Sequence, residues 1–284
     1  MPSQFNVRGV SRRDLLKGLA AAAVGAAVGA ADHGYVYERK QFSVVRETLL
    51  VSGLAPALAG LRVGFLSDLH RSDTVTHEMA STAVDMLMAE RPDIIMLGGD
   101  YVTMGGGRNR RFVGPAADAL APLSAPHGIF AILGNHDDDR DMPAALSRRG
   151  IEVLKDARTK LDIRGERLEL AGLRFWTRRP QDLARVLRNA AATVILLAHD
   201  PRRLTEAAAF DIPAVLSGHT HGGQVVLPGV GAVARRRFPV LEGLGSRENT
   251  SIFVSRGIGT VYVPIRINCP PEVAMISLKR RSQI

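Results

Sequence analysis

Short apolar runs alternate with segments of helical periodicity from about residue 41 to the end of the chain. The segment 77–92 is predicted to be a helix, because Met79, Ala83, Met86 and Leu87 share one face. Further helices are expected to about residue 120 and near 143–149 and 181–190. Strands are predicted at 42–51, 62–70, 93–100, 128–137, 193–200, 212–223, 251–259 and 272–279, with shorter ones around 151–175. Continuous apolar runs are typical of strands covered on both faces, so the pattern predicts one α/β domain with a mixed sheet core.

The first thirty-odd residues follow a different pattern. The basic stretch SRRDLLKG at 11–18 precedes LAAAAVGAAVGAA at 19–31, an apolar run that is short for a membrane span and rich in small residues suited to cleavage. The spacing S-R-R-x-L-L-K resembles a twin-arginine (Tat) export signal. We therefore expect a signal segment at 1–31 and a single domain at 32–284. A basic N-terminal helix packed on the body is the alternative.

Composition adds few constraints. The chain has 284 residues, 46% of them hydrophobic, which is ordinary for a globular protein. Its formal charge of +9 comes from pairs and triplets of arginine, such as Arg235–Arg237. Scattered pairs usually form a solvated face, but they also suit anionic partners such as phosphorylated substrates, phospholipid headgroups or wall polymers. A single cysteine, Cys269, excludes an internal disulfide framework.

Five of the predicted strands end, on their carboxyl side, in residues that commonly bind metals. These residues are Asp68, His70, Asp100, Asn135, His136, His199, His219 and His221. The carboxyl ends of strands in an open α/β sheet meet at one crevice, so we expect these side chains to converge. Asp68/His70 and His219/His221 each have i, i+2 spacing, which on an extended chain places both members on the same side.

For any one of these residues, an ordinary structural role is the simpler interpretation. A lone histidine at a strand end is usually a hydrogen-bonded polar group, and an aspartate before a loop is often a cap or turn residue. The number of such residues at one sheet end favours a different interpretation, because their uncompensated burial would cost several kcal/mol. Two divalent cations would compensate it, and oxygen and nitrogen ligands without cysteine suit Mn, Fe or Zn. Two ions about 3.5–4 Å apart are the usual arrangement for hydrolysing phosphate esters.

Five sequence blocks together resemble the calcineurin-like metallophosphoesterase superfamily. They are D-L-H at 68–70, G-G-D at 98–100, G-N-H-D at 134–137, His199 and G-H-T-H at 218–221. The tail S-R-G-I-G…P-I-R…C-P-P-E at 255–272, together with the N-terminal signal, is similar to a branch of Tat-exported or membrane-associated bacterial phosphoesterases. The resemblance implies a four-layer α/β/β/α sandwich with the metals between the sheet ends.

The resemblance also implies a role for each matching residue. One metal ion would be held by Asp68, His70 and His221, the other by Asn135, His199 and His219, and both by a bridging Asp100. A hydroxide between the metals would attack phosphorus in line, without a covalent enzyme intermediate. His136 would act on the leaving group as general acid or charge stabiliser, and Asp137 would orient it.

The sequence thus predicts a phosphoesterase, exported by the Tat translocon, that is periplasmic or on the outer face of the cytoplasmic membrane. Expected substrates are a small-molecule, lipid or cell-wall phosphate mono- or diester or diphosphate, and an anionic membrane surface is a further partner. One alternative is a UDP-2,3-diacylglucosamine pyrophosphatase-like hydrolase of lipid A synthesis, although export counts against it. The intact His136 disfavours a non-catalytic, metal-scaffolded binding module, and the lack of an aromatic-interleaved basic platform disfavours a nuclease. The role of Arg266 is left open.

Overall fold

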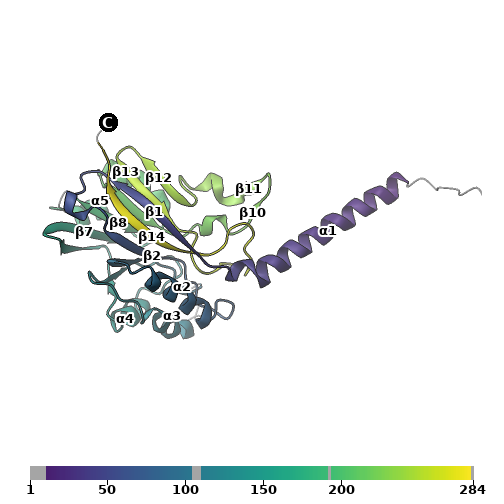
Figure 1. The fold of residues 1–284 in the computed structure, drawn as a ribbon, viewed down its shortest axis with the longest axis horizontal. Helices are drawn as coiled ribbons and strands as arrows, with labels where there is room; N and C mark the ends of the chain where they lie inside the picture. Colours follow the sequence, from purple (N-terminus) through teal and green to yellow (C-terminus); the bar gives the residue numbers. More distant parts are fainter. Residues whose placement is uncertain (1–10, 104–109, 191–192, 283–284) are drawn as a thin grey trace, which may run out of the picture.

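The computed structural model describes residues 11–103, 110–190 and 193–282 of the chain. Two six-stranded mixed sheets form its centre (Figure 1). The first has the order β1 (Ser43–Val51), β14 (Glu272–Arg280), β2 (Arg62–Leu66), β3 (Ile94–Leu97), β4 (Ile129–Ala131) and β5 (Glu152–Val153). The second has the order β12 (Gly243–Arg247), β13 (Thr250–Val254), β9 (Ala214–Ser217), β8 (Val194–Ala198), β7 (Glu166–Leu173) and β6 (Ala157–Ile163).

Each sheet is mainly parallel. In the first sheet β14 pairs parallel with β1 and antiparallel with β2, and β2 to β5 run parallel. In the second, β13, β9, β8 and β7 run parallel, and antiparallel β12 and β6 form the edges. The carboxyl ends of β2, β3, β4, β8 and β9 therefore carry the loops that hold the candidate site residues.

Helices cover the outer face of each sheet. Helices α2 (His77–Ala89), α3 (Val113–Leu120) and α4 (Asp141–Ser147) share a core with the first sheet, and α5 (Pro180–Leu187) and α6 (Leu204–Ala209) with the second. A third core, which includes Phe65, Leu170 and Phe253, fills the space between the sheets. The predicted α/β/β/α sandwich is confirmed, whereas the apolar pattern alone had indicated a mixed sheet without separating two.

Helix α1 (Arg12–Val36) is a single long helix that projects from the body (Figure 1). Its one buried residue is Gly34. By length and composition the helical stretch 12–40 is sufficient to cross a membrane, a test that a signal sequence near the N-terminus also passes. The helix therefore extends beyond the apolar run at 19–31 on both sides and continues through residue 31, the expected end of the signal segment.

Several elements were not anticipated, and some strands are shorter than expected. The unanticipated elements are α6, β12, the hairpin of β10 (Val226–Leu227) and β11 (Gly231–Ala232), and the 3-10 turns η1 (Glu38–Lys40), η2 (Pro56–Leu58), η3 (Arg110–Phe112), η4 (Pro201–Arg203), η5 (His221–Gly223) and η6 (Val233–Arg237). The strands predicted at 62–70 and 212–223 end at Leu66 and Ser217. The residues beyond them lie in loops whose backbone departs from the extended conformation.

The inter-sheet core generates a stability prediction. Phe253 of β13 packs edge-on against Phe65 of β2, with ring centroids 6.2 Å apart, and both are fully buried. The change Phe253→Ala should lower the free energy of unfolding by about 3–5 kcal/mol, measured by urea denaturation, because it leaves a cavity between the sheets. The control Phe210→Ala, at the exposed end of α6, should cost about 1 kcal/mol or less. Equal losses in the two variants would contradict this account.

Candidate metal centre

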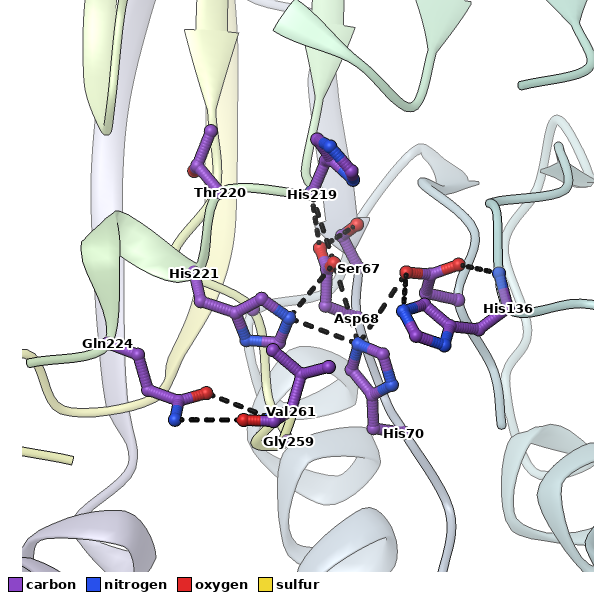
Figure 2. Close-up of polar contacts among 12 residues, drawn as sticks. Ser67, Asp68, His70, His136, His219, Thr220, His221, Gln224, Gly259 and Val261 are labelled. Atoms are coloured by element: carbon purple, nitrogen blue, oxygen red, sulfur yellow. Dashed lines mark hydrogen bonds and ion pairs between the residues drawn. The ribbon is translucent and has the colours of Figure 1, made fainter. Parts of the chain in front are cut away.

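Two groups of side chains converge at the carboxyl ends of the sheets. Asp68, His70 and His221 form the first group, and Asp100, His199 and His219 form the second. Within each group the ligand atoms lie within 4.8 Å of one another. His219 and His221 belong to different groups, the same division that the resemblance implied. Thr220 between them points away and donates its hydroxyl to the carbonyl of Leu241 (Figure 2).

The two groups adjoin one another through their carboxylates. Asp100 Oδ2 lies 3.1 Å from His199 Nε2 and 3.6 Å from His70 Nε2, so it faces a histidine of each group. Asp68 Oδ1 lies 3.4 Å from His221 Nε2 and 3.9 Å from His199 Nε2. The arrangement is therefore one continuous cluster with Asp100 near its middle.

The backbone at these residues is unusual. Asp68, His70, Asp100, His219 and His221 all have positive φ values, between 49° and 72°. The left-handed region is uncommon for residues other than glycine and is costly, so the surrounding structure must hold it. The expectation that the i, i+2 pairs point together because the chain is extended is wrong. They converge because the chain turns in the left-handed region after each strand has ended.

Neighbouring groups orient both carboxylates and one imidazole. Asp68 accepts hydrogen bonds from the hydroxyl of Ser67 at 2.5 Å and from the backbone N–H of His219 at 3.0 Å (Figure 2). Asp100 Oδ1 accepts the backbone N–H of His136 at 2.8 Å. His199 Nδ1 lies 2.7 Å from the carbonyl oxygen of Gly98 and donates to it, which directs Nε2 into the cluster.

The polar atoms in this cluster are placed to bind cations, because as hydrogen-bond partners for one another they are poorly matched. His70 Nε2 and His221 Nε2 face each other at 3.0 Å (Figure 2). Asn135 Oδ1 is buried and lacks a hydrogen-bond partner. Imidazole nitrogens and carboxylate oxygens without a thiolate are a donor set for borderline and hard divalent metals. The residues present therefore fit a metal site.

The pKa directions describe the same electrostatic situation. Burial lowers the pKa of His70 to about 3, so this imidazole is neutral and its lone pair is available. Burial is the largest single influence on the pKa of His199 and lowers it, but the charge of Asp100, the hydrogen bond to Asp100 and the charge of Asp68 together outweigh burial and raise the pKa to about 10. Burial raises the pKa of Asp68 to about 6. The buried carboxylates thus attract positive charge strongly enough to hold a proton on His199.

His136 and Asn135 both line a cavity of about 370 Å³ beside the cluster. The ring of His136 lies edge-on to that of His70, with centroids 5.0 Å apart, and its Nε2 is 3.9 Å from Asp100 Oδ2. Burial lowers the pKa of His136. The structure thus brings both residues of the G-N-H-D block to the cluster, and a molecule in the cavity meets them together.

Asp137 has contacts that the sequence did not indicate. Its carboxylate accepts hydrogen bonds from the backbone N–H groups of Asp100 at 2.7 Å, Tyr101 at 2.8 Å and Gly134 at 2.9 Å. It therefore fastens the loop after β3 to the loop after β4. The expectation that Asp137 orients the ring of His136 stays a prediction, whereas its positioning of Asp100 is observed.

Arg266, whose role the sequence left open, is fully buried under the first group. Its guanidinium donates to the carbonyl oxygens of Arg256, Gly257, Gly259 and Cys269. Gly257 and Gly259 in turn pack against Asp68 and His70 so closely that a Cβ atom would collide with them. Arg266 is therefore a positioning residue for the loop after β2. The sequence indicates this role only through the position of Arg266 between two apolar residues. That position does not show which carbonyl oxygens the guanidinium binds.

Comparisons with known proteins are consistent with this site. The family model described as calcineurin-like phosphoesterase matches residues 61–223. The chain is 30% identical over 283 residues to the uncharacterized metallophosphoesterase YkuE of Bacillus subtilis, covering 95% of this chain and 98% of YkuE. It is 31% identical over 288 residues to the phosphodiesterase YaeI of Escherichia coli, covering 95% and 99% of the two chains.

Two other similarities are more partial. A transmembrane protein with metallophosphoesterase domain of Danio rerio is 32% identical over 275 residues, which covers 87% of this chain and 60% of that protein. Among solved structures, the NAD nucleotidase of Haemophilus influenzae superposes with a TM-score of 0.50 at 15% identity, covering 70% of this chain and 45% of that one. The similarity to the NAD nucleotidase structure shows the fold alone.

The raised pKa of His199 predicts how metal binding depends on pH. Below about pH 10 the metal-free protein carries a proton on His199, and a cation must displace it from Nε2. The apparent affinity for Mn²⁺ should therefore rise with pH, by up to tenfold per unit, until about pH 10. Near pH 8, where Asp68 is already ionised, binding should release about one proton. Calorimetric titrations in two buffers of different ionisation enthalpy measure this number, and identical heats in both buffers would contradict it.

Proposed function

Because this chain belongs to the calcineurin-like phosphoesterase family, we propose that it hydrolyses a phosphate mono- or diester, or a diphosphate, with two divalent cations. The observation that carries the proposal is the position of Asp100, whose Oδ2 lies within 3.6 Å of an imidazole of each ligand group. A carboxylate shared between two groups suits two cations side by side better than one cation with surplus ligands.

The ligand assignment follows the two groups. Asp68, His70 and His221 would hold one cation, Asn135, His199 and His219 the other, and Asp100 both. The unpartnered Oδ1 of Asn135 supports its inclusion. When bound, Mn, Fe or Zn ions would supply positive charge to the phosphoryl oxygens and activate a water molecule for in-line attack.

His136 is the chain's own candidate for contact with the leaving group. It lines the cavity. Its backbone N–H donates to the carboxylate of Asp100, which fixes the position of the backbone that carries the ring. An imidazole has an N–H donor in either charge state, so His136 is able to hydrogen-bond the leaving oxygen and, when protonated, to transfer a proton to it. Asp137 contributes indirectly, since it holds the loops that carry Asp100 and His136.

The N-terminal helix gives information about the cellular compartment in which the protein acts. We propose that residues 1–31 are a Tat signal, that 32–284 form one phosphoesterase domain, and that the enzyme acts outside the cytoplasm or on the outer face of the membrane. The twin arginines at the start of an apolar, exposed α1 support this proposal. The substrate would then be a phosphoester encountered in that compartment.

Asn135→Ala and His136→Ala should have different effects if the roles are assigned correctly. Asn135→Ala should lower the bound metal measured by elemental analysis, because it removes one ligand. His136→Ala should retain metal but lower kcat by about 10²-fold or more on an ester with a poor leaving group, and by much less on a p-nitrophenyl ester. Asn249→Ala, remote on the loop between β12 and β13, is the control that should alter neither quantity. Full activity of His136→Ala on the poor leaving group would refute its assignment.

Export is tested by replacing the two arginines conservatively. Arg12→Lys/Arg13→Lys should retain the protein in the cytoplasm, because the Tat route depends on the arginine pair. Cell fractionation followed by mass spectrometry of the purified chain measures both the compartment and the position of the N-terminus. Arg8→Lys outside the motif is the matched control and should fractionate like the wild type. The same cytoplasmic location for all three proteins would exclude Tat export.

A further inference from the structure

The cavity beside the ligand cluster has both polar and apolar lining residues. The polar ones include Asp100, His136 and His219. The apolar ones include Val225, Ala234, Phe238 and the run Val261–Val263, and the ring of Phe238 lies 5.6 Å from that of His219. A substrate in this cavity would therefore meet apolar side chains directly beside the ligand cluster.

Part of this apolar lining is unusually exposed, and so are residues of the hairpin that follows Val225. In the hairpin of β10 and β11, Leu227 is 43% exposed and Val230 is 76% exposed. In the neighbouring loop, Tyr262 is 85% exposed and Val263 is 50% exposed. Single exposed apolar residues are ordinary, but a group at the mouth of a site marks a contact surface. We call Leu227, Val230, Tyr262 and Val263 the apolar rim.

Hydrogen bonds hold the two halves of the apolar rim together. The side chain of Gln224, just before β10, donates to the carbonyl oxygen of Val261 and accepts the N–H of Val261 (Figure 2). It also donates to the carbonyl oxygen of Val263. The N–H of Val226 donates to the carbonyl oxygen of Ile267 at 2.9 Å. The hairpin and the loop are therefore one surface rather than two independent segments.

Helix α1 leaves the body next to this surface. The N–H of Arg266 donates to the carbonyl oxygen of Gly34, and a Cβ on Gly34 would collide with Arg266 and Ile265. Figure 1 shows β10 and β11 on the side of the body from which α1 projects. Tyr35 and Tyr37, at the base of the helix, are exposed aromatic residues of the kind found at membrane interfaces.

Positive charge follows directly after the hairpin. The 3-10 turn η6 carries Arg235, Arg236 and Arg237, all exposed. Arginines beside exposed apolar side chains complement the anionic headgroups and acyl region of a lipid surface. A bilayer is the occupant that these features share, because α1, at the same edge, is long and apolar enough to enter one as long as it is retained as an anchor and not cleaved.

We propose that the apolar rim rests on an anionic lipid bilayer, with Arg235–Arg237 against its phosphates, and that the substrate is a phosphoester bearing an acyl or alkyl chain. The chain would lie along Phe238 and Val261–Val263 while the phosphate reaches the ligand cluster. The substrate class rests on the proposed function, whereas the docking surface does not require catalysis.

Lipid contact is measured by fluorescence quenching in the full-length protein reconstituted into vesicles. In a Trp176→Phe background, Tyr262→Trp places a single tryptophan in the apolar rim, and Leu50→Trp places one near the end of β1, remote from α1. Nitroxide-labelled phosphatidylcholine should quench the first and not the second. Quenching at position 262 should be stronger when the vesicles contain phosphatidylglycerol. Equal quenching of the two tryptophans would overturn the proposed docking surface.

A matched pair of charge variants tests delivery of the substrate. Arg236→Ser/Arg237→Ser should raise KM for a p-nitrophenyl phosphodiester with a long alkyl chain, carried in phosphatidylglycerol vesicles, by about tenfold or more. Lys279→Ser/Arg280→Ser removes the same charge at the end of β14 beside Leu50 and should leave that KM unchanged. Both variants should hydrolyse soluble bis-p-nitrophenyl phosphate at the wild-type rate.

The outcomes separate the two proposals. An unchanged vesicle KM in Arg236→Ser/Arg237→Ser, or an equal change in the control, would overturn the role of the arginines. Failure of the wild type to hydrolyse the soluble diester, the vesicle-borne diester, p-nitrophenyl phosphate and pyrophosphate with any of Mn²⁺, Fe²⁺ or Zn²⁺ would instead refute the proposed function. The quenching result would still decide whether the apolar rim contacts lipid.

Discussion

Two buried carboxylates, Asp68 and Asp100, set the constraint on which the rest of this structure depends. Each is almost completely removed from water, and an unpaired buried charge costs several kcal/mol. The chain surrounds them with imidazoles, with backbone N–H groups from His136 and His219, and with the hydroxyl of Ser67. These partners leave the cluster with excess attraction for positive charge, which is visible in the raised pKa of His199. A site of this kind is built to bind cations.

Meeting that constraint dictates an unusual backbone. Five of the ligand-type residues lie in the left-handed region, and the loops that carry them cross at very short range. A Cβ at Gly134 would collide with Asp100, and one at Gly218 would collide with Ser67 and Asp68. The glycines of G-N-H-D and G-H-T-H are therefore required by close approach between loops. Asp137 holds two of these loops together by accepting three backbone N–H groups.

The C-terminal tail connects the site to the base of the N-terminal helix. Arg266 holds the backbone at 256–259 against the loop after β2, and Cys269 donates its thiol to the carbonyl oxygen of His221. The N–H of Cys269 in turn donates to Glu38, just after α1. The base of the N-terminal helix, the ligand cluster and the loop at Val261–Val263 are thus linked by hydrogen bonds in this chain. These bonds fix the direction of the cavity relative to the base of α1.

The sequence by itself determined an α/β fold with a mixed sheet core and the residues gathered at its centre, and the four layers came from the family resemblance of the motifs. Apolar runs of strand length located β1, β2, β3, β8 and β14 to within a few residues, because burial on both faces leaves a continuous pattern, whereas β9 and β13 end well before the predicted strands do. The polar residues that follow these runs identified the ligand candidates, because the carboxyl ends of parallel strands share one edge. Three features depended on the tertiary structure: the left-handed turns that aim Asp68 and His221, the carbonyls bound by Arg266, and the apolar rim. Each arises where segments distant in sequence approach within hydrogen-bonding or van der Waals distance. Such an approach cannot be inferred from local residue patterns.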